Sequence, residues 1–113
     1  MTEEKVQAAM MIILHAGDAR AICMEALNAV AKNDFELADE KMKLASKEIT
    51  KAHKIQTDAI QDEAAGEEKS EYSLLFAHAQ DTLMTIMSEI NLAKQIISIS
   101  KTVDSRISAL EAK

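Results

Sequence analysis

The 113-residue chain has no proline, no tryptophan and only two glycines, and aromatic residues make up just 3% of it. Hairpins and sandwiches need glycine and proline at their turns and aromatic side chains along their strands, so this scarcity excludes an all-β fold. Hydrophobic residues nevertheless reach 48% of the chain. They are chiefly alanine, isoleucine, leucine and methionine, which favours helices around a modest core.

Cysteine is nearly absent as well. The single Cys23 cannot form an internal disulfide or supply a metal cluster, which is typical of a protein of the reducing cytoplasm. The chain opens with Thr2, Glu3 and Glu4, acidic where a secretory signal is basic, and the longest early apolar run, 8–14, is far shorter than the roughly 20 residues that span a bilayer. We therefore expect a cytoplasmic protein with no membrane insertion.

Positive charge is scarce too, because 13 basic residues face 19 acidic ones and the net charge is −6. No run of like charge is long enough to form a basic arm or stripe, so nucleic acid is not an expected partner. The length suits a single domain, 1–113, without room for a second core. A chain this short buries little apolar surface alone, so burial between subunits is a natural source of further stability.

Signals for helix ends divide the chain into three helices. Thr2 is a good N-cap for the first helix, and Asn33 or Asp34 both ends it and caps the second. Gly66 lies among charged residues in a second turn that closes on a candidate cap, Ser70. The sequence therefore predicts an all-α, antiparallel up-down-up three-helix bundle. Its helices are expected to cover about residues 3–32, 34–63 and 71–111.

Apolar residues three and four positions apart form a stripe on each predicted helix. On the first helix we expect one stripe to face the core: Val6, Met10, Ile13, Gly17, Ala21, Met24, Leu27 and Ala31. A second stripe gives that helix another buried side: Ile12, Ala16, Ala19, Ile22, Cys23, Ala26 and Val30. The second helix has one seam: Phe35, Ala38, Met42, Ala45, Ile49, Ala52, Gln56 and Ala59. The third helix has a main stripe, Phe76, Ala79, Leu83, Ile86, Ile90, Ala93 and Ile97, and a second face with Leu75, Leu92, Ile96, Ile99 and Val103. Such doubly apolar first and third helices predict packing against other subunits.

Common enzyme motifs are missing, since the sequence has no glycine-rich phosphate loop, cysteine pair or serine nucleophile elbow. Histidine is the remaining candidate for chemistry. His15 has Asp18 three positions on, and such a pair on one helix face can hold a metal or fix the imidazole tautomer. His53 is predicted to stabilise packing or hydrogen-bond across the bundle, and Cys23 to be an inert buried thiol.

His78 differs from the other histidines in its surroundings. It lies between two alanines, whose small side chains leave the imidazole open to an approaching partner. Thr82, four positions on, can offer a hydroxyl to whatever the imidazole binds. Asp81 is a carboxylate in an apolar stretch, where it needs a pairing partner or a bound cation. The structural alternative is a buried polar network of His78, Asp81 and Thr85 that fixes helix register.

The segment from His78 to Thr85 resembles the active-site helix of the lactose/cellobiose class of enzyme IIA, the phosphocarrier subunits of the bacterial sugar phosphotransferase system. Proteins of this family are three-helix bundles that assemble as trimers, so the resemblance implies a homotrimer. Further matching motifs follow in the same order along nearly the whole chain: Ala16-Gly17-Asp18-Ala19-Arg20, Asn33-Asp34-Phe35, Ala52-His53, Gln56-Thr57 and Ala65-Gly66-Glu67.

The resemblance implies that His78 accepts a phosphoryl group on Nε2 from phospho-HPr and passes it to a cysteine of a cognate IIB component. A neutral imidazole is abundant at pH 7 and is a competent nucleophile. No lysine or arginine lies within a turn of His78, so donors to the phosphoryl oxygens are expected from Thr82, another subunit or the docked partner. Gln80 is assigned a supporting role beside the site.

The resemblance also implies that Asp81 is a buried carboxylate that meets its two copies on the trimer axis and binds a divalent metal ion, magnesium by preference. Many family members have a second histidine at the position of Thr82, which could replace a phosphate contact but not a proton transfer. Gly17 is expected to permit close helix packing, and Arg20 to be structural.

Two other classes of function are alternatives to the phosphocarrier. A histidine phosphotransfer domain of a signalling relay is also helical, but such domains usually have a Lys-Gly pair shortly after the histidine, where this chain has Asp81 and Thr82. A non-catalytic oligomeric adaptor would use His78 and Asp81 only to specify register.

Overall fold

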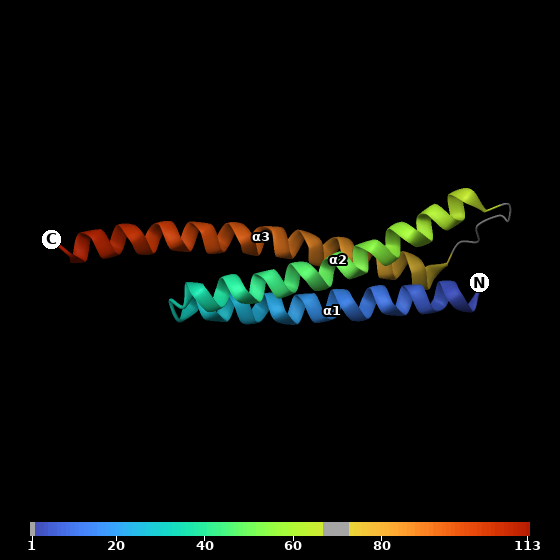
Figure 1. The fold of residues 1–113 in the computed structure, drawn as a ribbon, viewed down its shortest axis with the longest axis horizontal. Helices are drawn as coiled ribbons and strands as arrows, with labels where there is room; N and C mark the ends of the chain where they lie inside the picture. The colour runs from blue at the N-terminus through green and yellow to red at the C-terminus, as the bar shows by residue number, and fades with distance from the viewer. Residues whose placement is uncertain (1, 67–72) are drawn as a thin grey trace.

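The computed structural model describes residues 2–66 and 73–113 and contains no strand within them. Its three helices are α1 (Glu3–Ala31), α2 (Phe35–Ala65) and α3 (Leu74–Glu111). The chain runs along α1, returns along α2 and runs back along α3, as Figure 1 shows. This confirms the predicted up-down-up bundle.

A side-chain oxygen caps the N-terminus of each helix. The Thr2 hydroxyl accepts a hydrogen bond from the Lys5 backbone N–H at 3.2 Å, and the Asp34 carboxylate accepts one from Leu37 at 3.1 Å. At α3 the cap is Ser73, whose backbone is extended and whose hydroxyl accepts from the Phe76 N–H at 3.1 Å. The predicted cap Ser70 and the predicted helix start at residue 71 lie outside the described residues.

The turn from α1 to α2 is as tight as the sequence predicts. Asn33 has a φ of 60°, a left-handed conformation that asparagine tolerates better than most residues. The N–H groups of Asn33 and Asp34 then return to the carbonyls of Val30 and Ala29, each at 2.9 Å. One short segment therefore both ends α1 and caps α2.

The core confirms the predicted stripes of α2 and α3. All seven residues of the α3 main stripe are buried, and so are six of the α2 seam, with Phe35 and Ala59 half-buried. Ten of the nineteen buried apolar residues among those described are alanines. Small side chains let helix backbones approach closely, so the core is narrow. Its largest fully buried side chains are Ile12, Leu83, Ile86 and Ile90.

The prediction for α1 was wrong about which stripe faces the core. Most of the second stripe is buried with Ala9 and Ala29, whereas Met10 and Met24 of the first stripe are 54% and 53% exposed. Gly17 lies on the exposed stripe, and a Cβ placed there would meet nothing within 4 Å. Within one chain, Gly17 is therefore not needed for close helix packing. The alanine-rich side of α1 faces the core because its side chains are small enough for close packing, whereas the larger methionines lie on the outer side.

The bundle is a rod of 70 × 18 × 18 Å with a radius of gyration of 18.5 Å. A compact chain of this length would have a radius near 13 Å. Part of the excess comes from α3, whose C-terminal part extends beyond the α1–α2 turn (Figure 1). From Ile99 onward, α3 carries four large exposed apolar residues: Ile99, Val103, Ile107 and Leu110.

Among the described helices, only α1 is long and apolar enough to cross a membrane, with a mean hydropathy of 1.2 over 18 residues. A core helix meets the same criteria, and α1 supplies seven buried residues to the bundle. Only 28% of that apolar window is buried inside the chain. The rest of the apolar surface of α1 faces outward.

Candidate functional site

His78 lies in the second turn of α3 with an exposed side chain. Its neighbours Ala77 and Ala79 are half-buried and buried, so the backbone beneath the imidazole is held by the core. No hydrogen bond to the His78 imidazole occurs within 2–66 and 73–113. Asp81 and Thr85 are exposed as well, so the buried polar network considered from the sequence is not formed in a single chain.

The Thr82 side chain is half-buried beside His78. Its hydroxyl donates a hydrogen bond to the His78 backbone carbonyl at 2.8 Å, the common i to i−4 contact of threonine in helices. The oxygen can still accept a hydrogen bond, but the hydroxyl must rotate before it can donate to a bound group. Gln80 is half-buried on the same turn.

Asp81 lies on an exposed face of α3 that we call the outer seam: His78, Asp81, Thr85, Ser88, Leu92, Ile96, Ile99 and Val103. These residues step by three and four and so follow one side of the helix. The first half of the outer seam is polar and the second half is apolar. The Asp81 carboxylate is exposed in one chain, whereas the sequence predicted a buried group, and any burial of it requires a second copy.

The positive charge of Lys5 lies beside Phe76, on the side of α3 away from His78. The Lys5 ammonium lies 5.1 Å from the centre of the Phe76 ring and pairs with Glu63 of α2. Phe76 is buried and His78 exposed, so the two side chains lie on different sides of α3. Lys5 therefore cannot stabilise a group on His78 of its own chain.

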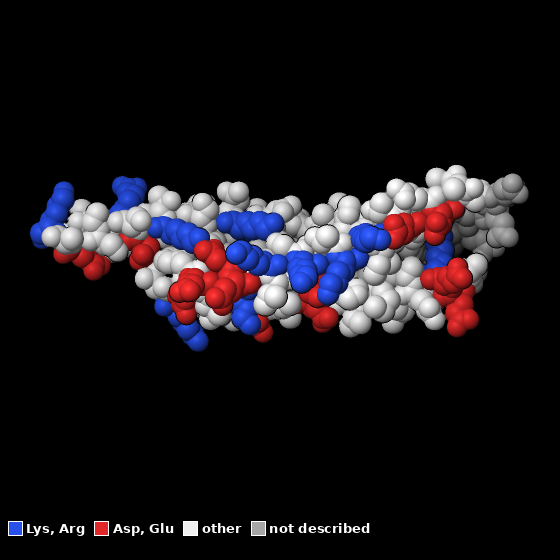
Figure 2. All heavy atoms as spheres, in the orientation of Figure 1, with Lys and Arg blue, Asp and Glu red and all other residues white. Residues whose placement is uncertain are grey.

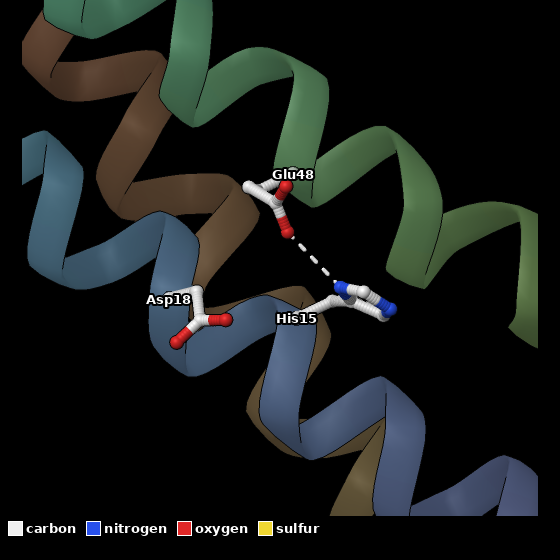
Figure 3. Close-up of side chains that lie close together, drawn as sticks. All are labelled: His15, Asp18 and Glu48. Atoms are coloured by element: carbon white, nitrogen blue, oxygen red, sulfur yellow. Dashed lines mark hydrogen bonds and ion pairs between the residues drawn. The ribbon is translucent and has the colours of Figure 1, made fainter.

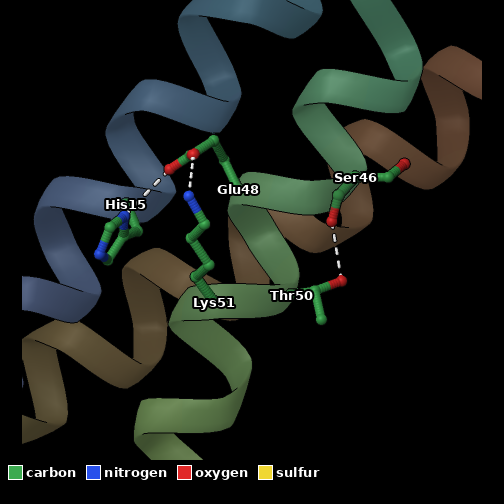
Figure 4. Close-up of polar contacts among 5 residues, drawn as sticks. All are labelled: His15, Ser46, Glu48, Thr50 and Lys51. Carbon is green, nitrogen blue, oxygen red and sulfur yellow. Dashed lines mark hydrogen bonds and ion pairs between the residues drawn. The ribbon is translucent and has the colours of Figure 1, made fainter.

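His15, unlike His78, has a partner in the fold. Its Nδ1 lies 3.0 Å from Oε2 of Glu48 on α2, and the other Glu48 oxygen accepts a hydrogen bond from Lys51 at 2.7 Å, as Figure 4 shows. The Lys51 and His15 hydrogen bonds hold the pKa of Glu48 below its usual value. The sequence analysis missed Glu48, because pairing it with His15 requires the register of α2 against α1. His53 is exposed and makes no hydrogen bond among the described residues, contrary to the predicted packing role.

The predictions for Arg20 and Cys23 hold. Arg20 donates from Nε to Glu89 at 2.7 Å and so joins α1 to α3. Cys23 is 4% exposed, and burial, followed by the charge of Glu89, raises the pKa of its thiol. A protonated thiol is a poor nucleophile, so Cys23 is inert.

Lysines gather on one side of the bundle despite the acidic net charge. Figure 2 shows Lys and Arg side chains in a band along the middle of the rod. On α2 the exposed Lys43, Lys47, Lys51 and Lys54 recur every three or four residues and share one helix face. The sequence excluded a basic stripe because these residues are not consecutive, but the helix brings them together. Two of them are paired, Lys51 with Glu48 and Lys54 with Asp58.

Comparison with known proteins gives one consistent family. The lactose/cellobiose-specific IIA subunits of the phosphotransferase system match residues 7–101. The lichenan-specific phosphotransferase enzyme IIA component of Bacillus subtilis is 44% identical over 103 residues, which cover 91% of this chain and 93% of that protein. The N,N′-diacetylchitobiose-specific EIIA component of Escherichia coli is 35% identical over 97 residues, or 86% of this chain and 83% of that protein.

Solved structures show the same fold. The cellobiose-specific enzyme IIA from Bacillus anthracis superposes with a TM-score of 0.83 at 39% identity, covering 93% of this chain and 94% of that one. The chitobiose IIA of E. coli, solved in a complex with HPr, superposes with a TM-score of 0.79 at 32% identity, covering 91% and 99%.

Proposed function

Because this chain belongs to the lactose/cellobiose-specific IIA family of the phosphotransferase system, we propose that His78 carries a phosphoryl group in the uptake of a β-linked disaccharide. His78 accepts the group from phospho-HPr and passes it to a cysteine of a cognate IIB component in the cytoplasm. The observation that carries this proposal is the exposed imidazole of His78, which has no hydrogen-bond partner within 2–66 and 73–113, on a helix held by the core. A related IIA protein has been solved with HPr, which supports HPr as the donor.

The imidazole supplies the nucleophile without help from a base in this chain. The neutral imidazole is a competent nucleophile through the lone pair of Nε2. As Nε2 attacks, a nitrogen–phosphorus bond forms and the bond from phosphorus to the donor breaks. In the second step the cysteine thiolate of IIB attacks phosphorus, and the electron pair returns to Nε2. Phosphoryl transfer depends mainly on this in-line geometry and on stabilised oxygens.

The groups that stabilise the phosphoryl oxygens come largely from outside this chain. Lys5 is held on the other side of α3, and the Thr82 hydroxyl donates to a backbone carbonyl in the free protein. Thr82 reaches the phosphoryl group after rotation, and Gln80 supports the same turn. The docked partner supplies positive charge, so the complete site forms only in the complex.

We further propose that three copies assemble around the outer seam of α3 from Asp81 onward, so that His78, at the end of the seam, stays accessible to HPr and IIB. The apolar half of the seam needs cover, since Leu92 and Ile99 are 62% and 61% exposed in one chain. Around a threefold axis the three Asp81 carboxylates converge, where their charges would repel one another. A divalent ion relieves that repulsion, and carboxylate oxygens fit magnesium. When bound, the ion neutralises this cluster and fixes the position of α3 beside His78.

Intact-protein mass spectrometry tests the acceptor residue. The wild-type chain is incubated with phosphoenolpyruvate, enzyme I and HPr, in parallel with His78→Ala and with His53→Ala as a matched exposed histidine. We expect one acid-labile phosphoryl group on the wild type and on His53→Ala, and none on His78→Ala. Phosphorylation of His78→Ala, or its absence from the wild type, would refute the assignment. Circular dichroism checks that each variant keeps its helices.

A further inference from the structure

A second cluster of metal-binding side chains lies between α1 and α2. His15 and Asp18 come from α1 and Glu48 from α2, and one ligand atom of each lies within 4.8 Å of the other two (Figure 3). Asp18 is exposed, whereas His15 and Glu48 are half-buried with side chains 20% and 21% exposed. The site is thus open to solvent on one side and backed by the bundle on the other.

We propose that His15, Asp18 and Glu48 bind a divalent transition-metal ion such as zinc, with water as the remaining ligand. Metal–ligand bonds of about 2.0–2.2 Å place the ligand atoms of one tetrahedral ion roughly 3–4 Å apart. His15 Nδ1 and Glu48 Oε2 already lie 3.0 Å apart. Rotation of the exposed Asp18 carboxylate brings the third ligand into range.

The choice of metal follows from the ligands. An imidazole nitrogen with two carboxylates suits zinc, manganese, cobalt or nickel, whereas magnesium and calcium prefer oxygen ligands alone. This separates the cluster from the proposed Asp81 site on α3, which is made only of carboxylates. In the free protein Nδ1 donates its proton to the Glu48 carboxylate, so binding of a metal ion through the Nδ1 lone pair displaces that proton and leaves the imidazole protonated on Nε2.

Lys51 orients the cluster without entering it. It donates to Oε1 of Glu48 at 2.7 Å, while Oε2 faces His15, as Figure 4 shows. The carboxylate is therefore held with one oxygen directed to the place of the ion. Such partners of a metal ligand fix its orientation.

A simple ion-pair network explains only part of this cluster. His15 and Lys51 account for Glu48, but Asp18 adds a second carboxylate nearby, and no lysine or arginine among the described residues pairs with it. Two carboxylates this close repel each other, and a divalent ion removes that conflict. A bound ion would join α1 to α2 by ligands from both helices. It is independent of phosphoryl transfer, so its failure would leave the role of His78 unaffected.

Zinc titration by calorimetry tests the site in the full-length protein, with excess magnesium present to fill sites made only of oxygen ligands. We expect one zinc ion per chain for the wild type and for His53→Gln and His78→Gln, the control variants. Loss of a partner that merely orients a metal ligand costs 10–100-fold in affinity, so His15→Gln and Asp18→Asn should each weaken binding at least about tenfold. The zinc-dependent rise in melting temperature should disappear with them.

Two results would overturn the proposal: no zinc binding by the wild type, or equal binding by the wild type and His15→Gln. Asp18→Asn keeps the hydrogen bond of His15 to Glu48 intact and leaves the interior of the bundle unchanged. It therefore remains informative if His15→Gln loses stability. Loss of zinc from His78→Gln instead would assign the ion to His78 and likewise reject the site.

Discussion

At the scale of single residues, the availability of His78 comes from what surrounds it. Two alanines leave the imidazole free, and the core holds the turn below it. The sequence could group His78, Thr82 and Asp81 as candidates because all three lie on one helix, where spacing alone sets their relation. It could not pair His15 with Glu48, since that contact depends on how two helices slide against each other.

Replacing Glu48 with glutamine tests this contact between helices. The lowered pKa of Glu48 means that folding favours its ionised form, so its contribution is present above the ordinary value of 4.5 and is lost as the pH falls below it. We expect Glu48→Gln to lower the free energy of unfolding at pH 7 by less than about 1 kcal/mol, because solvent screens the pair. Urea unfolding at pH 7 and pH 3.5 measures the difference, which should become smaller at the lower pH. Glu40→Gln, which changes an exposed carboxylate on α2, is the control. A difference in stability between the wild type and Glu48→Gln that stays constant with pH would contradict this explanation.

At the scale of the helices, the sequence predicted two of the three core faces correctly. The stripes of α2 and α3 differ clearly from their polar sides, whereas α1 is apolar on two sides. Hydrophobicity alone predicts that the side of α1 with the bulky residues Met10 and Met24 faces the core. Packing instead places the alanine side of α1 in the core, because the close approach of the helices leaves no room for methionine. That choice depends on the distance between helices, which a single sequence does not contain.

The cap of α3 offers a test of how the helix supports His78. Ser73 accepts a hydrogen bond from the Phe76 N–H, one of the unpaired donors at the start of the helix. Ser73→Ala should lower the free energy of unfolding by about 1 kcal/mol. Ser73→Asp should keep most of the wild-type stability, because aspartate also caps helices. Chemical denaturation measures both variants. Equal stability of Ser73→Ala and the wild type would show that the cap does not hold the first turns of α3.

At the scale of the whole molecule, the chain is a rod with large exposed apolar faces. Three exposed methionines and Leu14 lie on α1, and the apolar half of the outer seam runs along α3 toward its C-terminus. The sequence predicted this excess correctly from the two-sided stripes. The partner surfaces and their register lie outside a single chain, so the arrangement of copies could be predicted only by resemblance.

The trimer predicts different effects for two equally exposed apolar residues. Ile96 on the outer seam is 47% exposed and Leu44 on α2 is 49% exposed. Ile96→Glu should place a charge in the interface and convert the trimer to monomers that keep their helices. Leu44→Glu should remain trimeric, because α2 lies away from the outer seam. Light scattering after size-exclusion chromatography measures the mass of each. A monomeric wild type, or a trimeric Ile96→Glu, would contradict the proposed assembly.

We propose that His78 carries a phosphoryl group and does not merely receive one. The direct measurement is a chase: the phosphorylated chain is freed of enzyme I and phosphoenolpyruvate, mixed with unphosphorylated HPr, and followed by intact mass spectrometry. Exchange between two phosphohistidines is nearly balanced in energy, so we predict that the group moves back to HPr while the chain returns to its original mass. A phosphoryl group that stays on the chain, or is lost to water without reaching HPr, would contradict the account.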